Sequence, residues 1–222
     1  MSRVLNIIVE GPTEREFVTN CMYPYFFEHN VSNVRPIGIE TSPGHKGGDV
    51  RYQARFKPNV QAVLRGKEDF LVTSFIDFYR LRSDFPKYGE AQRIADVQQR
   101  EHFLERACYN DIGDGRFIPY IQLHEFEALL FTKIDGFRDF TETPVSNMAE
   151  IEKIIEAHPN PELINDTPQN APSKRLERLV VPKYQKPFHG PYIAMVNGFD
   201  VITQKCPRFN RWVTTLIQRM NA

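Results

Sequence analysis

Four short apolar segments, each followed by a helical pattern, constrain the fold of this chain more than any other feature. They are residues 4–9, 34–40, 70–76 and 117–123. The first and third are almost continuously apolar, which is typical of strands that are buried on both faces. Because strand and helix alternate four times, the sequence predicts an α/β fold. We expect a mostly parallel four-stranded sheet flanked by helices, with additional C-terminal helices.

Capping signals and apolar periodicity locate the helices. Thr13 and Glu16 form a capping box that opens the first helix. Further helical patterns cover 90–108, 147–158, 173–181 and 208–220, and another helix begins within 124–131. A connector rich in Pro and Asn occupies 159–172. We therefore expect a single domain over residues 1–222, with an α/β core at 1–140 and a mainly helical, basic C-terminal extension at 141–222.

Length and composition restrict the class of protein. A chain of 222 residues suits one domain, and 41% hydrophobic residues are enough for a core. No apolar run approaches the roughly 20 residues that span a bilayer, and the N-terminus lacks a secretory signal pattern. Cys21, Cys108 and Cys206 are widely spaced and form no metal-binding pair. We expect buried thiols in a reducing compartment, and hence a cytoplasmic protein without membrane association.

Charge is unevenly distributed along the chain. The net charge is zero, but nine basic residues from Lys174 onward stand against Glu177 and Asp200. The C-terminal segment therefore carries +7 and residues 1–173 carry −7. This asymmetry favours a metal site in the acidic part and polyanion binding by the basic part. An ordinary solvated helix surface would explain it equally well.

Carboxylates follow the expected strands. Glu10 closes the first strand, Asp77 closes the third, and Glu125 and Glu127 follow the fourth. Glu14 lies on the first turn of the helix after Glu10. Ligands gather at the carboxyl ends of parallel strands, and carboxylates packed together repel one another unless a cation is present. Oxygen ligands favour Mg²⁺ or Mn²⁺, although a single acid after a strand is often a cap. Glu125 and Glu127 point differently, so we expect one of them to face the site.

Two segments have the character of phosphate-binding elements. Lys46 lies in a Gly-rich loop whose backbone N–H groups could surround a phosphate. Lys174 and Arg175 begin a helix just after Pro172, where basic side chains and backbone donors coincide. A flexible loop and solvated surface are the alternatives for these two segments. The remaining basic side chains that we expect to give background phosphate contacts are Lys183, Lys186, Arg208 and Arg211.

Several motifs resemble those of known families. The sequence VEGPTE at 9–14 resembles the first motif of Toprim domains, especially the version found in OLD-type nucleases. Nearly the whole chain is also similar to a Toprim-related family, domain of unknown function 4276 (DUF4276). The segments that carry this second resemblance are DFY at 77–79, DFP at 84–86, LHEFEALLF at 123–131 and PSKRL at 172–176.

The resemblance implies a compact parallel α/β fold that binds Mg²⁺ and cuts or joins nucleic-acid phosphodiesters. It implies that Glu10 is a general acid/base or metal ligand and that aspartates after the third strand hold metal. It also implies an ATPase partner and a role in bacterial defence against phage. Toprim domains usually carry Asp-x-Asp after that strand, whereas Tyr79 takes the second place here. Asp84 could supply the missing carboxylate if its loop folds back.

These observations lead to one main hypothesis and two alternatives. The main hypothesis is a Mg²⁺-dependent (or Mn²⁺-dependent) nuclease with Glu10 and Asp77 as catalytic residues, acting as the effector of an ATPase-coupled defence system. Metal would be held by Glu10, Glu14, Asp77, Glu125 and Glu127, and phosphate by Lys46, Lys174 and Arg175. The alternatives are a non-catalytic subunit that docks on an ATPase, and a metal-dependent hydrolase of a small phosphorylated molecule. DNA and RNA both remain open as substrates, as does a homo-oligomer.

Overall fold

The computed structural model describes residues 3–42, 45–46, 50–140, 142–164 and 167–222. Its main sheet has the order β2-β1-β5-β6, and β7 also pairs with β5. Every pairing in this sheet is parallel. The strands are β1 Val4–Val9, β2 Val34–Gly38, β5 Phe70–Asp77, β6 Phe117–Ile118 and β7 Ile121–Gln122. The expected mostly parallel sheet is therefore confirmed.

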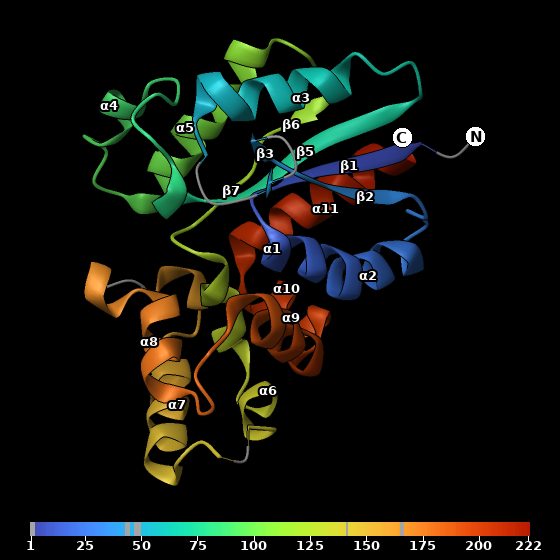
Figure 1. Ribbon diagram of the computed structural model, residues 1–222. Coiled ribbons are helices and arrows are strands. Elements are labelled where there is room, and N and C mark those ends of the chain that lie inside the picture. The colour runs from blue at the N-terminus through green and yellow to red at the C-terminus, as the bar shows by residue number, and fades with distance from the viewer. Residues whose placement is uncertain (1–2, 43–44, 47–49, 141, 165–166) are drawn as a thin grey trace.

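Helices cover both faces of the sheet (Figure 1). On one face lie α3 Lys57–Leu64 and α5 Val97–Ile112, and on the other lie α1 Pro12–Phe17, α2 Tyr23–Glu28 and α11 Pro207–Asn221. The other α-helices are α4 Tyr88–Ala91, α6 Asp135–Arg138, α7 Val145–Ala157, α8 Pro172–Leu179, α9 Lys186–Asn197 and α10 Phe199–Lys205. Short π-helical turns cover Val18–Met22 and Tyr52–Phe56, and 3₁₀ helices cover Phe78–Arg80, Phe126–Thr132, Pro161–Leu163 and Pro168–Asn170.

The central strands are buried on both faces, as their apolar sequences indicate. Leu5 and Ile7 of β1 belong to the core beneath α1 and α11, whereas Val4 and Ile8 belong to the core beneath α3 and α5. Side chains alternate between the faces of a strand, so a strand in the middle of a sheet needs apolar residues at almost every position. The two cores thereby fix β1 and β5 side by side, and their carboxyl ends coincide.

The C-terminal helices complete the core on the α1 face. The ring of Phe209 in α11 lies 6.1 Å from that of Phe17 in α1. Trp212 stacks on Phe75 of β5 at 5.5 Å and an interplanar angle of 22°. Aromatic pairs at these separations add to the free energy of burial. The last segment of the chain is therefore packed directly against the sheet.

The edge of the sheet differs from the strand that we expected at 117–123. Pairing with β5 is interrupted at Pro119 and Tyr120, between β6 and β7. Proline has no backbone N–H to donate to a neighbouring strand. Ser74 compensates, because its Oγ donates to Tyr120 O and accepts from Tyr120 N, each at 2.9 Å.

Two helical segments differ from the expected boundaries. The pattern at 90–108 forms α4 and then α5, which begins only after Asp96 because this residue caps the helix by accepting from Gln99 N at 2.8 Å. After β7, His124 has a φ of 61°, and the 3₁₀ helix Phe126–Thr132 replaces the α-helix expected within 124–131. A residue in the left-handed region does not continue a right-handed helix, so the helix starts after it.

The expected strand at 34–40 and the Gly-rich loop that follows it also differ from the prediction. Strand β2 ends at Gly38, and β3 Glu40–Ser42 pairs with β4 His45–Lys46 in a small antiparallel hairpin. Residues 43–44 and 47–49 of the loop lie outside the described residues.

Within the described part of the chain, none of the helices combines the length and apolarity that crossing a membrane requires.

Helices α9 and α10 were not expected from the sequence. Pro187, Gly190 and Pro191 all lie in α9, and residues of these types disfavour helix interiors. Pro187 is tolerated because it lies in the first turn, where backbone N–H groups have no helical partner. Packing against α1 supplies the remaining stability, and Cys21 Sγ donates to Pro191 O at 3.6 Å.

Candidate functional site

Two acidic residues lie together at the carboxyl ends of the central strands. Val9 at the end of β1 pairs with Phe75 of β5, so Glu10 and Asp77 follow on adjacent strands. Both are nearly inaccessible, with 7% of Glu10 and 3% of Asp77 exposed. Burying two carboxylates is unfavourable without compensating charges or hydrogen bonds. Packing alone does not explain why two acidic residues are buried here, so they mark a candidate functional site.

Helix α1 brings a third carboxylate to the same edge. Glu14 Oε2 accepts a hydrogen bond from Gly11 N at 3.0 Å, so Glu14 caps the start of α1 in place of the expected pair Thr13 and Glu16. The Glu14 side chain is 5% exposed. This hydrogen bond turns the side chain back toward the end of β1, and its charge acts on Asp77.

The 3₁₀ helix Phe126–Thr132 brings a fourth carboxylate and is anchored by Asp77 itself. Asp77 Oδ1 accepts from Phe126 N at 2.8 Å. Glu127 is fully buried, and Lys186 Nζ at the start of α9 lies 2.9 Å from Glu127 Oε1 and 4.0 Å from Asp77 Oδ2. Tyr184 OH donates to Glu127 Oε1 at 3.5 Å. We call Glu10, Glu14, Asp77, Glu127 and Lys186 the carboxylate–lysine cluster.

The electrostatics of this cluster are dominated by burial and by excess negative charge. Burial raises the pKa of Asp77 well above its ordinary value; the Lys186 ammonium opposes this, and Glu14, Glu10 and Glu127 add to it. Burial also raises the pKa of Glu127 to about 7, against the effect of Lys186. For Lys186, burial alone would lower the pKa, but Glu127 and Asp77 raise it above its ordinary value. Asp77 thus interacts with three other carboxyl groups but with only one ammonium group in this cluster.

Glu125 points to a neighbouring element. Its two carboxylate oxygens accept from Ser173 N and Ser173 Oγ, each at 3.0 Å, at the start of α8. A carboxylate at this position is favoured by the free N–H groups of the helix terminus. Glu127 faces Lys186 and Asp77, whereas Glu125 fixes α8 beside the cluster.

The remaining predicted site residues are placed as follows. Lys174 is exposed and pairs with Glu177 at 2.7 Å, and Arg175 is largely buried, with its Nε donating to Asn170 O at 2.8 Å. Both follow Ser173, so α8 places them near Glu125 but not in the carboxylate–lysine cluster. Lys46 lies in β4, and its side chain is outside the described part of the structure.

Family comparison identifies the wider group to which this arrangement belongs. A family model described as "Domain of unknown function (DUF4276)" matches residues 9–217. The chain belongs to this family. A comparison with proteins of curated function found no match.

Two solved structures are similar to this DUF4276 protein. The C-terminal region of the Burkholderia pseudomallei OLD protein is 15% identical, with a TM-score of 0.50 over 96% of this chain and 98% of that one. The C-terminal region of the Xanthomonas campestris pv. campestris OLD protein is 15% identical, with a TM-score of 0.49 over 99% of this chain and 96% of that one. At this identity the likeness to the Burkholderia protein concerns the fold alone, and it agrees with the Toprim-type resemblance of the sequence.

The fit of a metal ion to the DUF4276 cluster rests on its donor chemistry. Buried carboxylate oxygens suit Mg²⁺ or Mn²⁺, and Glu127 Oε2 has no hydrogen-bond partner among the described residues. Among the described residues, no group of three Asp, Glu, His or Cys side chains is arranged closely enough to hold an ion. Lys186 Nζ lies between Glu127 and Asp77, so a bound ion would require rotation of the long Glu and Lys side chains.

Asp84, the residue expected to supply the missing second carboxylate, has a different role in the structure. Asp84 is exposed, and its Oδ2 accepts from Gln53 N at 3.2 Å, so its loop caps the neighbouring helical turn. Tyr79 is 36% exposed, and its ring lies 5.7 Å from that of His124. Burial lowers the pKa of His124 to about 4, so its imidazole is neutral at physiological pH.

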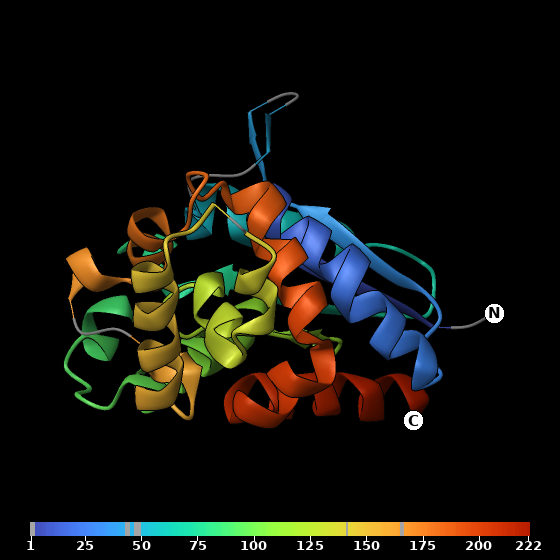
Figure 2. The same ribbon diagram turned by 90° about the horizontal axis from the view of Figure 1, so that it is seen from below.

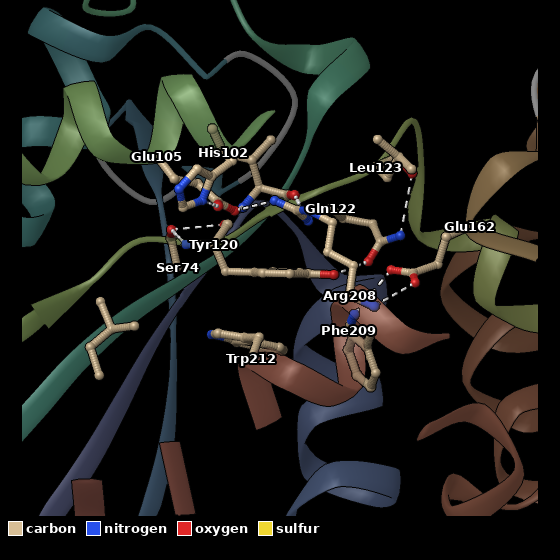
Figure 3. Close-up of polar contacts among 12 residues, drawn as sticks. Ser74, His102, Glu105, Tyr120, Gln122, Leu123, Glu162, Arg208, Phe209 and Trp212 are labelled. Atoms are coloured by element: carbon tan, nitrogen blue, oxygen red, sulfur yellow. Dashed lines mark hydrogen bonds and ion pairs between the residues drawn. The ribbon is translucent and has the colours of Figure 1, made fainter. Parts of the chain in front are cut away.

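Arg208 is part of an internal network and not a free phosphate contact (Figure 3). Its guanidinium forms an ion pair with Glu105 and donates to Ile121 O at 2.6 Å. It also lies 4.7 Å above the ring of Tyr120. With 10% of its side chain exposed, Arg208 has little surface to offer a polyanion. The expectation that Arg208 is a background phosphate contact is therefore wrong, because tertiary packing supplies it with a buried partner.

Lys186 is the residue of the cluster that sequence reasoning undervalued. The sequence places it in the basic C-terminal segment, without a role that distinguishes it from Lys183. No local pattern links it to Glu127, which lies 59 residues earlier in the chain. A useful signal is the pair of prolines that follows, since Pro187 in a first turn positions Lys186 at the start of a helix.

Proposed function

We propose that this protein hydrolyses phosphodiester bonds of nucleic acid with the help of Mg²⁺ or Mn²⁺. The observation that carries this proposal is the carboxylate–lysine cluster itself. It brings carboxylates from three separate segments, and an ammonium group from a fourth, to the carboxyl ends of two parallel strands. Open α/β sheets bind their ligands at this edge. A structural role alone would not require four buried acids in a cluster that contains a single base.

Glu10, Glu14 and Asp77 are the residues that would hold the ion, with Glu127 as a further ligand after it separates from Lys186. A divalent ion in such a site supplies a Lewis acid and lowers the pKa of a bound water. Asp77 also positions the segment that carries Glu127, through its hydrogen bond with Phe126 N. Glu10 and Asp77 are therefore the residues whose loss should remove activity first.

Positive charge near the cluster would bind the phosphate. Lys186 Nζ is held among the carboxylates, and it would contact the phosphate once a divalent ion offsets the charge of those carboxylates. The carboxylate of Glu125 occupies the start of α8, and the exposed Lys174 that follows would contact the neighbouring phosphate. Lys46, which lies in β4, is the third residue proposed to bind phosphate.

The family resemblance adds a biological setting to this proposal. It suggests an ATPase partner, either DNA or RNA as substrate, and a role in bacterial defence against phage. Tyr79 in place of a second aspartate favours one alternative, a docking subunit that lacks catalysis. Metal binding separates the two functions, because a docking subunit has no need to bind a divalent cation.

The test is calorimetric titration of Mn²⁺ into the wild type and into Glu10→Gln, Asp77→Asn and Asp69→Asn. Asp69 lies just before β5 at its opposite end and is exposed, so Asp69→Asn is the matched control. We expect saturable binding in the wild type and the control, and its loss in the other two variants. Cleavage of labelled DNA and RNA should then fall by about a hundredfold or more in Lys186→Met.

Absence of binding up to millimolar Mn²⁺ would remove the proposed chemistry and favour the docking subunit. Binding that survives both Glu10→Gln and Asp77→Asn would show that the ion lies elsewhere. If the ion binds but no polynucleotide is cut, hydrolysis of small phosphorylated molecules becomes the next activity to assay.

A further inference from the structure

A groove between α1 and α9 begins beside the carboxylate–lysine cluster. Figure 2 shows α9 lying alongside the nearly continuous helix formed by α1, the π-helical turn and α2. The groove has a volume of about 570 Å³, which is in the size range of ligand sites. Its lining residues are Pro12, Glu16, Asn20, Pro187, Phe188, Pro191, Tyr192 and Met195. We call it the α1–α9 groove.

The groove exposes more apolar side chain than a solvated helix surface requires. Phe188, Tyr192 and Met195 occupy successive turns of one face of α9 and expose 71%, 41% and 52% of their surface. Tyr192 is held in place, since its hydroxyl donates to Asp139 at 2.7 Å and its ring meets Phe140 edge-on at 6.2 Å. Phe188 has no ring contact among the described residues and presents its ring to solvent.

The groove is continuous with the cluster through both of its walls. Pro12 lies two residues after Glu10, and Phe188 lies two residues after Lys186. From Pro12 the wall runs along the helix to Asn20, a rise of roughly 12 Å at 1.5 Å per residue. Nucleotides of a stacked strand are about 3.4 Å apart, so roughly three bases would fit along this length.

We propose that the α1–α9 groove binds unpaired bases next to the scissile phosphate, with Phe188 as the stacking platform. This inference rests on the proposed function and defines its substrate class as single-stranded polynucleotide. Aromatic faces bind successive bases without sequence preference, and neighbouring proline rings extend the apolar surface. Glu16 and Asn20, joined by a 3.1 Å hydrogen bond, offer acceptors and donors to base edges.

The charge of the groove disfavours a duplex. The charged side chain that lines it is the carboxylate of Glu16, whereas a duplex presents phosphates on its outer surface. A single strand can instead turn its bases toward α9 and its phosphates toward Lys186 at the cluster. The geometry thereby separates base binding in the groove from phosphate binding at the strand ends.

The test is fluorescence anisotropy with a labelled 12-nucleotide single strand, as DNA and as RNA, and with the corresponding blunt duplex. All proteins carry Asp77→Asn so that cleavage does not consume the probe. Phe188→Ala should weaken single-strand binding by about tenfold, with Phe188→Leu in between, because stacking contributes about 1–3 kcal/mol per base. Phe27→Ala, at an exposed ring on α2 outside the groove, is the matched control and should bind like the parent.

The outcomes distinguish this inference from the proposed function. Unchanged single-strand affinity in Phe188→Ala, with cleavage retained in the protein that keeps Asp77, would overturn the groove assignment alone. Binding of no oligonucleotide by the parent, nor by the protein that keeps Asp77 when cleavage is blocked with EDTA, would overturn both. A parent dimer that Phe188→Ala dissociates without a change in oligonucleotide affinity would reassign the groove to self-association.

Discussion

At the scale of single residues, buried carboxylates dominate the chemistry of this protein, and their surroundings differ. Lys186 offsets part of the charge of Glu127 and Asp77, and it does so within 4.0 Å of both. Removing one partner of a buried pair costs more than the pair contributes, because the other charge remains buried. Lys186→Met should therefore affect both the stability of the cluster and phosphate binding.

Glu101 on α5 is a buried carboxylate outside the cluster, and it makes stability depend on pH. Neither carboxylate oxygen has a hydrogen-bond partner among the described residues. Burial raises the pKa of Glu101 to about 8, although Arg208 and Arg100 oppose this. The folded state therefore keeps the proton while the unfolded chain loses it near pH 4.5. The stabilisation is complete below pH 4.5 and is lost as the pH rises through 8.

We expect Glu101→Gln to be insensitive to this effect, because an amide does not titrate. Relative to the variant, the wild type should lose about 4 kcal/mol of unfolding free energy between pH 4.5 and 8.5. Urea unfolding of both proteins across this range measures the difference. An equal pH dependence in the two proteins would show that Glu101 has an ordinary pKa in the folded state.

At the scale of elements, the network around Arg208 joins the last helix to the edge of the sheet (Figure 3). Arg208 links α11 to Glu105 on α5 and to β7 through Ile121 O. Glu162 accepts from the backbone N–H of Arg208 and Phe209 at 2.9 and 3.0 Å, which caps the start of α11. The edge strand is short and interrupted, so these side chains replace the hydrogen bonds of a longer ladder.

Arg208→Met should destabilise the protein by about 3–5 kcal/mol, because it leaves Glu105 buried without its ion-pair partner. Combining it with Glu105→Leu should recover part of this loss, since neither charge then remains. Arg211→Met is the control on the same helix, because Arg211 is exposed, and it should shift stability by less than about 0.5 kcal/mol. Thermal or urea unfolding gives all four values. Additive losses in the double variant would contradict a coupled pair.

At the scale of the whole molecule, the C-terminal extension is part of the core on one face of the sheet. Buried residues from Leu5 to Leu216 form one cluster, in which Phe209 and Trp212 of α11 contact Phe75 of β5. Helix α9 also supplies Lys186 to the site. Both the stability of the sheet and the composition of the site thus depend on residues after 180.

A fragment of residues 1–140 should therefore fail to fold cooperatively. Its β1, β5 and α1 would expose the apolar side chains that α9, α10 and α11 cover in the full chain. Near-UV circular dichroism and calorimetry should show weak aromatic signals and no sharp transition, in contrast with residues 1–222. A fragment with a sharp transition and native-like spectra would establish the α/β core as an independent domain.

The sequence by itself determined the central strands, the helices beside them and the acids at the strand ends. These features follow from local patterns, because a strand buried on both faces must be apolar throughout and because strand ends in a parallel sheet share an edge. The outer elements were less predictable. Pro119 interrupts the edge strand, and α9 forms despite its prolines because packing against α1 outweighs local propensity.

Only the tertiary structure decided which side chains are partners. It brought Lys186 to Glu127, directed Glu125 to Ser173, and paired Arg208 with Glu105 across 103 residues of chain. Periodicity records which face of an element is buried, but it carries no information about which charge lies opposite. That choice is made when helices dock on the sheet, because a buried charge is stable only beside the partner that the fold supplies.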